Sequence, residues 1–249
     1  MCKKILSVLL CAIFVFCAFS VFVIAEDGET VCTTAADMLK YVIIERSNTV
    51  PIRIVPATLE KDAETTPVYL IGLLGVKENN KQVNSGKNLV PAAFHRPNSY
   101  YDLVKETILA TIPEGSNLVF ACHSLGGMVA QHLRTDEDLK ANYEIINVLT
   151  AGSPLILVNE EACEGELHRL ADKYDVIPFM SPATILNLKK QINSAAREDG
   201  GYFFNPDGAH NLSYLRDDVW GAYDVFGVKD GDATLSYNAS EAVFYGAVQ

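Results

Sequence analysis

Apolar and polar residues follow one another along the chain in blocks that predict strands and helices in turn. Short apolar runs predict buried strands, the last of them with a weaker pattern, at 67–71, 118–122, 145–150 and 167–174. Between the first two runs, apolar residues recur at helical spacing after Ser99, and Asp102 stands three positions on, which predicts a helix capped by Ser99. This alternation predicts an α/β fold with a mostly parallel central sheet and helices on both faces.

Two further segments have distinctive patterns. Residues 77–98 are polar and glycine-bearing around a small apolar island at 90–94, which predicts a loop that is either a mobile flap or a plain solvated connection. Residues 183–197 have the spacing of an amphipathic helix, and we expect its pair Lys189 and Lys190 to lie on a solvated face.

The chain begins with an export pattern. Lys3 and Lys4 precede a run without charges from residue 5 to residue 25, which indicates a signal peptide with a cationic start and an apolar middle. The run is also close to the ~20 residues that span a bilayer, so an uncleaved anchor that associates residues 5–25 with the membrane is the alternative. In both cases we expect one domain, 26–249, on the outer side, secreted or anchored, because the lysines stay in the cytoplasm.

Charge and cysteine content narrow the possible partners. The chain has 20 Lys and Arg against 31 Asp and Glu, a net charge of −11, and the export segment contributes only positive charge to this balance. An acidic domain is not expected to bind nucleic acid or strongly anionic surfaces.

Cys32, Cys122 and Cys163 lack metal-ligand spacing, and a Cys32–Cys163 disulfide is compatible with export but not indicated by the spacing. No pattern for a metal, nucleotide or flavin is present, and we expect no cofactor.

The strongest chemical signal is the stretch 120–130, FACHSLGGMVA, which places Ser124 between an apolar strand and a helix of small residues. A sharp turn at this point forces the serine into a strained backbone conformation and requires small neighbours two positions away. Gly126 and Gly127 meet this requirement behind Ser124, whereas Cys122 stands where glycine is usual. We interpret Ser124 as a nucleophile, in preference to a chance Ser-x-Gly in a turn.

The stretch from His123 to Gly127 resembles the nucleophile elbow of α/β-hydrolases, in particular that of the class-three (fungal-type) lipases. Two later stretches are also similar to that family: LTAGSP at 149–154, which ends the next strand, and DVIP at 175–178, which follows another. The resemblance covers about residues 65–215. It implies a serine hydrolase, a lipase or esterase, that cleaves carboxylic esters, and we expect lipid esters.

A serine hydroxyl needs a base and an orienting acid, which in this fold follow in the order serine, acid, histidine. His168 and His210 are the histidines after residue 132. His168 lies in a predicted strand before the candidate acid, so His210, in a turn-rich loop, is the candidate base. Asp175 is the candidate acid. Its competitors are Asp207 and Asp172, and we expect Asp172 to be solvated.

The resemblance also implies an oxyanion hole, with one backbone N–H from Leu125 and a second from a loop after an earlier strand. The segment 72–75 is the natural source, and we assign the second donor to Leu73, although a simple tight turn is the alternative. This segment lacks the histidine and the hydroxyl residue that related enzymes use there. We interpret three other residues as packing or surface groups: His95, Met128 and His132.

Two other functions are compatible with the same residues. An acyl-enzyme can be resolved by an alcohol as well as by water, so an acyltransferase or thioesterase on the same fold is one alternative. The other is a non-catalytic ligand-binding protein on this scaffold, for which Cys122 and the unusual loop at Gly72 would be signs of decay. The presence of Ser124, Asp175 and His210 together argues against that second alternative.

Overall fold

A computed structural model describes residues 28–43, 50–76, 80–156, 160–181 and 195–246. The predicted signal or anchor at 1–25 lies outside these ranges, as do residues 183–194 of the predicted amphipathic helix with their two lysines. Within the ranges, no helix combines the length and the apolar character that a membrane span requires.

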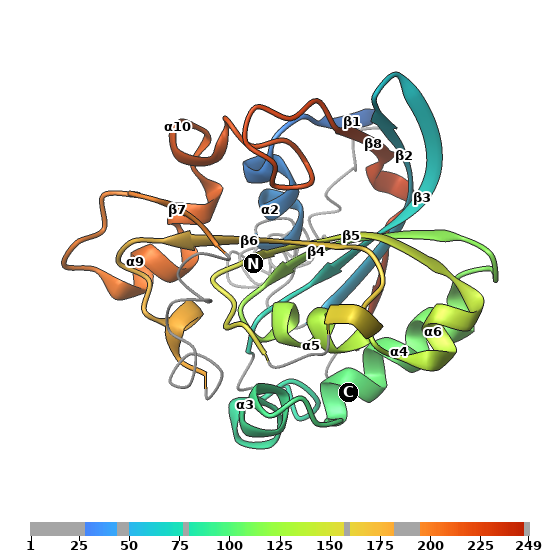
Figure 1. The fold of residues 1–249 in the computed structure, drawn as a ribbon, viewed down its shortest axis with the longest axis horizontal. Coiled ribbons are helices and arrows are strands. Elements are labelled where there is room, and N and C mark those ends of the chain that lie inside the picture. The colour runs from blue at the N-terminus through green and yellow to red at the C-terminus, as the bar shows by residue number, and fades with distance from the viewer. Residues whose placement is uncertain (1–27, 44–49, 77–79, 157–159, 182–194, 247–249) are drawn as a thin grey trace, which may run out of the picture.

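A nine-stranded mixed sheet forms the centre of the protein (Figure 1). Its order is β1-β8-β2-β3-β4-β5-β6-β7, with β9 also paired to β2. The strands are β1 (Glu29–Cys32), β2 (Ile52–Lys61), β3 (Glu64–Leu73), β4 (Asn117–His123), β5 (Glu144–Ala151), β6 (Glu166–Asp172), β7 (Ala196–Glu198), β8 (Thr234–Asn238) and β9 (Val243–Tyr245). Strands β3 to β7 pair in parallel, whereas β1, β2, β8 and β9 pair antiparallel. The general α/β prediction is therefore confirmed, but the sheet is mixed.

The four apolar runs coincide with neighbouring strands of the parallel part. Runs 67–71, 118–122 and 145–150 lie within β3, β4 and β5, and run 167–174 covers β6, which ends earlier than predicted, at Asp172. Strand β4 lies between β3 and β5, and its residues from Leu118 to Cys122 are completely buried. Apolar residues on both faces are the expected composition of such a strand, because helices cover both sides.

Helices cover both faces of the sheet, as predicted. They are α2 (Ala35–Ile43), α3 (Ser85–Ala93), α4 (Ser99–Thr111), α5 (Leu125–Leu133), α6 (Glu137–Asn142), α9 (Pro206–Asn211) and α10 (Asp217–Trp220). Short 3₁₀ turns are η1 (Glu160–Ala162), η2 (Ile177–Phe179), η3 (Ser213–Leu215) and η4 (Ala239–Glu241). Figure 1 shows α2 on one face and α3 to α6 on the other, and a separate apolar cluster fills each side.

The helix predicted after Ser99 is α4, but its cap is one residue earlier. The side-chain oxygen of Asn98 accepts hydrogen bonds from the backbone N–H groups of Tyr100 at 3.1 Å and Tyr101 at 3.0 Å. The hydroxyl of Ser99 donates instead to Asn88 at 3.0 Å. Asparagine is as good an N-cap as serine, so the sequence contained two valid candidates and local propensity did not separate them.

Two predictions of local structure are wrong. Segment 77–98 is not simply a loop, because it contains α3, whose N-cap is the Asn84 side chain accepting from Lys87 N–H at 3.2 Å. The predicted helix 183–197 does not extend to its expected end, because Ala196 to Glu198 form β7 and pair with β6. In both places, packing or pairing with distant residues decided the conformation more strongly than local pattern did.

The two cysteines considered for a disulfide lie far apart in the sheet order. Cys32 is buried in β1, at one edge, whereas Cys163 lies between η1 and β6, close to the other edge. Both belong to the part of the chain that the structure covers, and the disulfide between them is not formed.

Candidate active site

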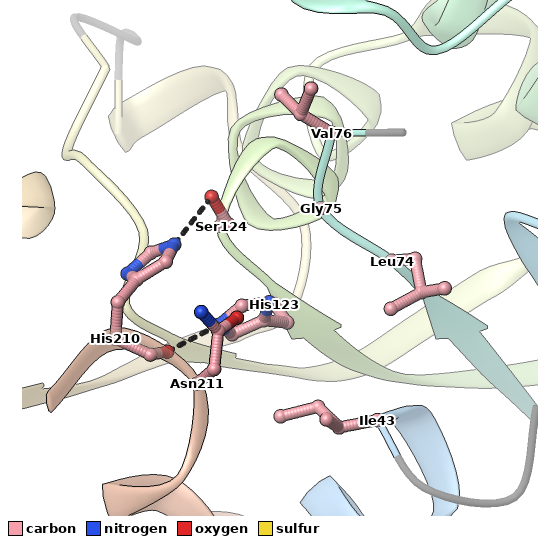
Figure 2. Close-up of a pocket in the computed structure, with 8 residues that line it drawn as sticks. All are labelled: Ile43, Leu74, Gly75, Val76, His123, Ser124, His210 and Asn211. Carbon is pink, nitrogen blue, oxygen red and sulfur yellow. Dashed lines mark hydrogen bonds between the residues drawn. The ribbon is translucent and has the colours of Figure 1, made fainter. Parts of the chain in front are cut away.

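Ser124 forms the sharp turn between β4 and α5, as its sequence pattern predicts (Figure 2). Its φ of 53° and ψ of −121° are a strained combination for a residue with a side chain. Its backbone N–H donates to Ala151 O of the next strand at 3.0 Å, which holds the turn against β5. The hydroxyl is thereby presented above the carboxyl end of the parallel strands.

The small residues around this turn are required by close backbone contacts. A Cβ built on Gly126 would lie 2.5 Å from the carbonyl oxygen of Leu73, and one built on Gly127 would lie 2.6 Å from Cβ of Ser153. Both distances are too short for any side chain. Cys122, at the position where glycine is usual, is completely buried within β4, so its compact side chain is accommodated.

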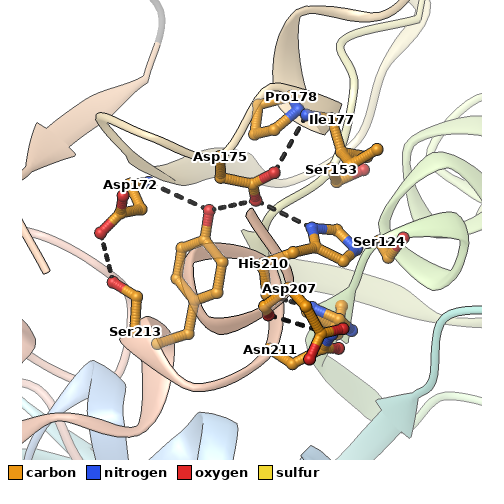
Figure 3. Close-up of polar contacts among 12 residues, drawn as sticks. Ser124, Ser153, Asp172, Asp175, Ile177, Pro178, Asp207, His210, Asn211 and Ser213 are labelled. Atoms are coloured by element: carbon orange, nitrogen blue, oxygen red, sulfur yellow. Dashed lines mark hydrogen bonds and ion pairs between the residues drawn. The ribbon is translucent and has the colours of Figure 1, made fainter. Parts of the chain in front are cut away.

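Three residues distant in sequence come together at this turn (Figure 3). Nε2 of His210 lies 3.1 Å from Oγ of Ser124, and Nδ1 of His210 lies 2.8 Å from Oδ2 of Asp175. His210 comes from α9, and Asp175 from the loop between β6 and η2. The structure thus places Ser124, Asp175 and His210 in one hydrogen-bonded chain.

The partners of His210 determine which ring nitrogen carries the proton. A carboxylate only accepts hydrogen bonds, so Nδ1–H donates to Asp175, and in the neutral ring Nε2 has a lone pair. The Ser124 hydroxyl can then donate to Nε2. This is the arrangement in which a histidine can remove a proton from a serine.

Asp175 is held by three donors and is almost completely buried, with 1 % of its side chain exposed. Besides His210, its Oδ2 accepts from the hydroxyl of Tyr214 at 2.8 Å, and its Oδ1 accepts from the backbone N–H of Ile177 at 3.0 Å. Burial, together with the neighbouring carboxylate of Asp175, raises the pKa of Tyr214 well above 10, so its hydroxyl keeps its proton. These three hydrogen bonds hold the carboxylate in place beside Nδ1 of His210.

The competing acids lie elsewhere, and one of them differs from its predicted environment. Asp172 is not solvated: it is completely buried and accepts from Ser213 Oγ at 2.5 Å and Gly200 N–H at 2.8 Å (Figure 3). Asp207 is exposed and accepts from the side-chain amide of Asn211 at 2.9 Å. Sequence position could not show that Ser213 and Gly200 would cover Asp172.

A pocket of about 400 Å³ opens beside Ser124 (Figure 2). Its lining consists of Ile43, Leu74, Gly75, Val76, His123, Ser124, His210 and Asn211. Leu73, the predicted second oxyanion donor, does not belong to this lining. It is the last residue of β3, paired with Ile52 on one side and Cys122 on the other. The loop predicted at 72–75 is therefore wrong for Gly72 and Leu73, which continue the strand.

Two backbone segments flank Ser124. Leu125 is the first residue of α5, a position whose N–H has no acceptor within the helix. On the other side Gly75 lies against Ser124, since a Cβ built on it would be 3.4 Å from Oγ. The N–H of Leu74 is already bonded to Pro51 O at 3.0 Å. Gly75, rather than Leu73, therefore lies beside the Ser124 hydroxyl.

Two residues for which the sequence predicted no role contact the group formed by Ser124, Asp175 and His210. They are His123 and Tyr214. His123 was noted only as part of the serine motif, although a buried histidine next to the nucleophile is itself a signal. His95 and His132 are packing residues, as predicted, with ring centroids 4.1 Å apart, and Met128 is buried.

Throughout the ranges described above, no group of three or more His, Cys, Asp or Glu side chains is arranged to hold a metal ion.

In comparisons with known proteins, no family model matches the chain, and neither does any curated protein or solved structure. The assignment of a function therefore depends on the geometry around Ser124.

Proposed function

We propose that this protein is a serine hydrolase of the α/β-hydrolase type that cleaves carboxylic esters. The observation that carries the proposal is a continuous series of hydrogen bonds. It runs from Ser124 Oγ to Nε2 of His210 at 3.1 Å and from Nδ1 of His210 to Asp175 at 2.8 Å. In this chain Ser124 is the nucleophile, His210 the general base and Asp175 the acid that orients the base.

The position of the site in the fold supports this class. The nucleophile follows β4, which has a parallel strand on each side, and is at the amino end of α5. Asp175 and His210 follow later strands in the order that the α/β-hydrolase fold uses. The α/β-hydrolase class is also compatible with a group of antiparallel strands, β1, β2, β8 and β9, beside the parallel ones.

The proposed reaction proceeds in two steps. Oγ of Ser124 attacks the ester carbonyl while Nε2 of His210 takes its proton, and the negative charge of Asp175 stabilises the imidazolium. The imidazolium gives this proton to the departing alcohol, which leaves an acyl group on Ser124. Water, deprotonated by Nε2 of His210, then attacks the acyl carbonyl. The bond from the acyl group to Oγ breaks, the imidazolium returns its proton to Oγ, and the acid leaves.

The carbonyl oxygen becomes negatively charged in both steps and requires hydrogen-bond donors. The N–H of Leu125 supplies one donor in the proposed site. For the second we replace Leu73 with a backbone N–H of Gly75 or Val76, because these residues line the pocket.

The pocket lining supports an ester with an apolar part. The aliphatic side chains of Ile43, Leu74 and Val76 belong to this lining together with polar groups, and the volume of about 400 Å³ is in the usual range for small-molecule sites. We therefore propose lipid esters as the substrate class. The sequence pattern of residues 1–25 supports export, with the domain acting outside the cytoplasm, secreted or anchored.

Hydrolysis of p-nitrophenyl esters of increasing acyl length tests the proposal. We expect turnover by the purified protein that is lost in Ser124→Ala and falls by about 10⁴-fold in Asp175→Asn, because the histidine then loses its correct tautomer. Asp207→Asn is the matched control, since this carboxyl is exposed near the site without contacting His210, and it should leave turnover unchanged. Equal effects of the two aspartate variants would contradict the assignment of the acid.

A further inference from the structure

His123 is a buried side chain that joins the nucleophile strand to the base. It is the last residue of β4, is 4 % exposed, and its Nε2 lies 2.7 Å from the backbone carbonyl oxygen of His210 (Figure 2). The two imidazole rings are also in contact, with centroids 4.7 Å apart. His123 therefore touches both the main chain and the ring of the proposed base.

The carbonyl acceptor on His210 also determines the tautomer of the His123 ring. A carbonyl oxygen only accepts, so Nε2 of His123 carries the proton, and in the neutral ring Nδ1 has a lone pair. That nitrogen faces the end of β3, because a Cβ built on Gly75 would lie 3.3 Å from it. A single side chain thus contacts the segment of the nucleophile, the segment of the base and the segment proposed to complete the oxyanion hole.

The local structure around His210 explains why such a contact matters. Helix α9 has only six residues, Pro206–Asn211, and helices this short are not stable by themselves. The last carbonyl groups of a helix have no N–H partner within it, and His210 is the penultimate residue. The bond from His123 satisfies this carbonyl and fixes the main chain from which the imidazole of His210 extends.

We infer that His123 is a positioning residue: its Nε2–H bond to the His210 carbonyl sets the position of the His210 ring relative to Ser124 Oγ. The inference rests on the proposed function. His123 takes no proton in the reaction, because its Nε2–H is committed to the carbonyl and its Nδ1 faces Gly75. Its contribution is therefore geometric, and a displacement of about 1 Å at a reacting group can lower a rate by about 10²-fold.

Two amide substitutions test the bond, because they differ in reach. The amide nitrogen of a glutamine extends to about the position of Nε2, whereas that of an asparagine extends only to about the position of Nδ1. In His123→Gln the donor to His210 is retained, and in His123→Asn it is lost while the polarity is kept. His123→Leu removes both polar contacts.

The readouts are the rate of covalent labelling by a fluorophosphonate and the kcat and KM for a p-nitrophenyl ester, measured on the full chain. We expect His123→Asn and His123→Leu to lose about 10- to 100-fold in labelling rate and in kcat with KM little changed, and His123→Gln to stay within about fivefold of the unsubstituted protein. Equal rates for the glutamine and asparagine variants, whether high or low, would overturn the inference. If the leucine variant does not fold, the comparison of His123→Gln with His123→Asn still tests whether the bond to His210 is required.

A second measurement separates this inference from the proposed function. Nitrogen-15 NMR of the histidine rings reports the tautomer of His123 whether or not the protein is an enzyme. The inference requires a proton on Nε2, and a ring that carries its proton on Nδ1 alone would overturn it. Failure of the unsubstituted protein to be labelled would instead count against the proposed function.

Discussion

The backbone of Gly75 lies directly against the side chain of Ser124: a Cβ built on Gly75 would be 2.8 Å from Cβ of Ser124 and 3.4 Å from its Oγ. No pair of real side chains approaches so closely. In the proposed reaction, this contact would bring a backbone segment close to the place where negative charge develops.

Gly75→Ala should therefore lower esterase activity by about 100-fold or more, because the new methyl group displaces Ser124 or the segment that would stabilise the oxyanion. Gly86→Ala in α3 is the control, since a Cβ there meets only Asn84 Oδ1, at 3.7 Å. This control should keep full activity and gain about 0.5–1 kcal/mol of stability, as expected for glycine replaced by alanine within a helix. Equal activity of the two variants would show that Gly75 is not close to the reacting groups.

Tyr214→Phe should weaken the support of the acid without removing the acid itself. The variant loses the donor to Asp175 and the acceptor of the Asp172 backbone N–H, which is 3.0 Å from the same hydroxyl. Hydrogen bonds to charged groups contribute about 1.5–3 kcal/mol, so the free energy of unfolding should fall by that order. Activity should fall less than in Asp175→Asn, because the carboxylate is still present.

Chemical denaturation and ester turnover measure both effects. The matched control is Tyr174→Phe, whose hydroxyl makes only a long bond of 3.5 Å to Asp199 at the surface. That variant should resemble the unsubstituted protein in stability and in rate. A Tyr214→Phe variant that behaves like this control would mean that the hydroxyl does not support Asp175.

His132 should make the fold less stable in mild acid. Burial lowers the pKa of its imidazole to about 4, with a smaller contribution from His95, whereas an unperturbed histidine titrates near 6.5. As the pH falls from about 6.5 to about 4, the unfolded chain binds a proton at His132 that the folded protein excludes. Stability should decrease across this window by up to about 3 kcal/mol from this group, and no further below it.

Urea denaturation at pH 7 and at pH 4.5 tests this linkage, with His132→Phe as the comparison. Phenylalanine retains a ring that can stack on Tyr101, whose centroid is 4.2 Å from that of His132, but it does not titrate. The variant should lose less stability between the two pH values than the unsubstituted protein. Identical losses would show that His132 is not excluded from protonation by the fold.

Local stereochemical requirements explain why the sequence predicted the turn at Ser124 correctly. A strand, a serine and two glycines in succession can be read within a dozen residues, and the strained backbone at Ser124 is expected from that stretch alone. The proximity of Asp175 and His210 to Ser124 was predicted from their order along the chain and from the resemblance, not from any local pattern.

Predictions that depended on distant contacts were less accurate. The burial of Asp172 comes from Ser213 and Gly200, 41 and 28 positions away, which no local pattern specifies. Strand β2 contains Arg53 and Pro56 and was not predicted, because its partners β3 and β8 determine it rather than its own composition. Leu73 was assigned a loop position because Gly72 looked like a strand end, although pairing continues for one more residue.

The most direct test of the proposed function is to treat the protein with a fluorophosphonate and locate the adduct by mass spectrometry of the peptides. This reagent reacts with a serine that a base has activated and needs no knowledge of the natural substrate. We predict a single adduct on Ser124, absent from Ser124→Ala and formed much more slowly in His210→Gln. Folded protein that forms no adduct, or forms it at another residue, would contradict the assignment of Ser124 as the nucleophile.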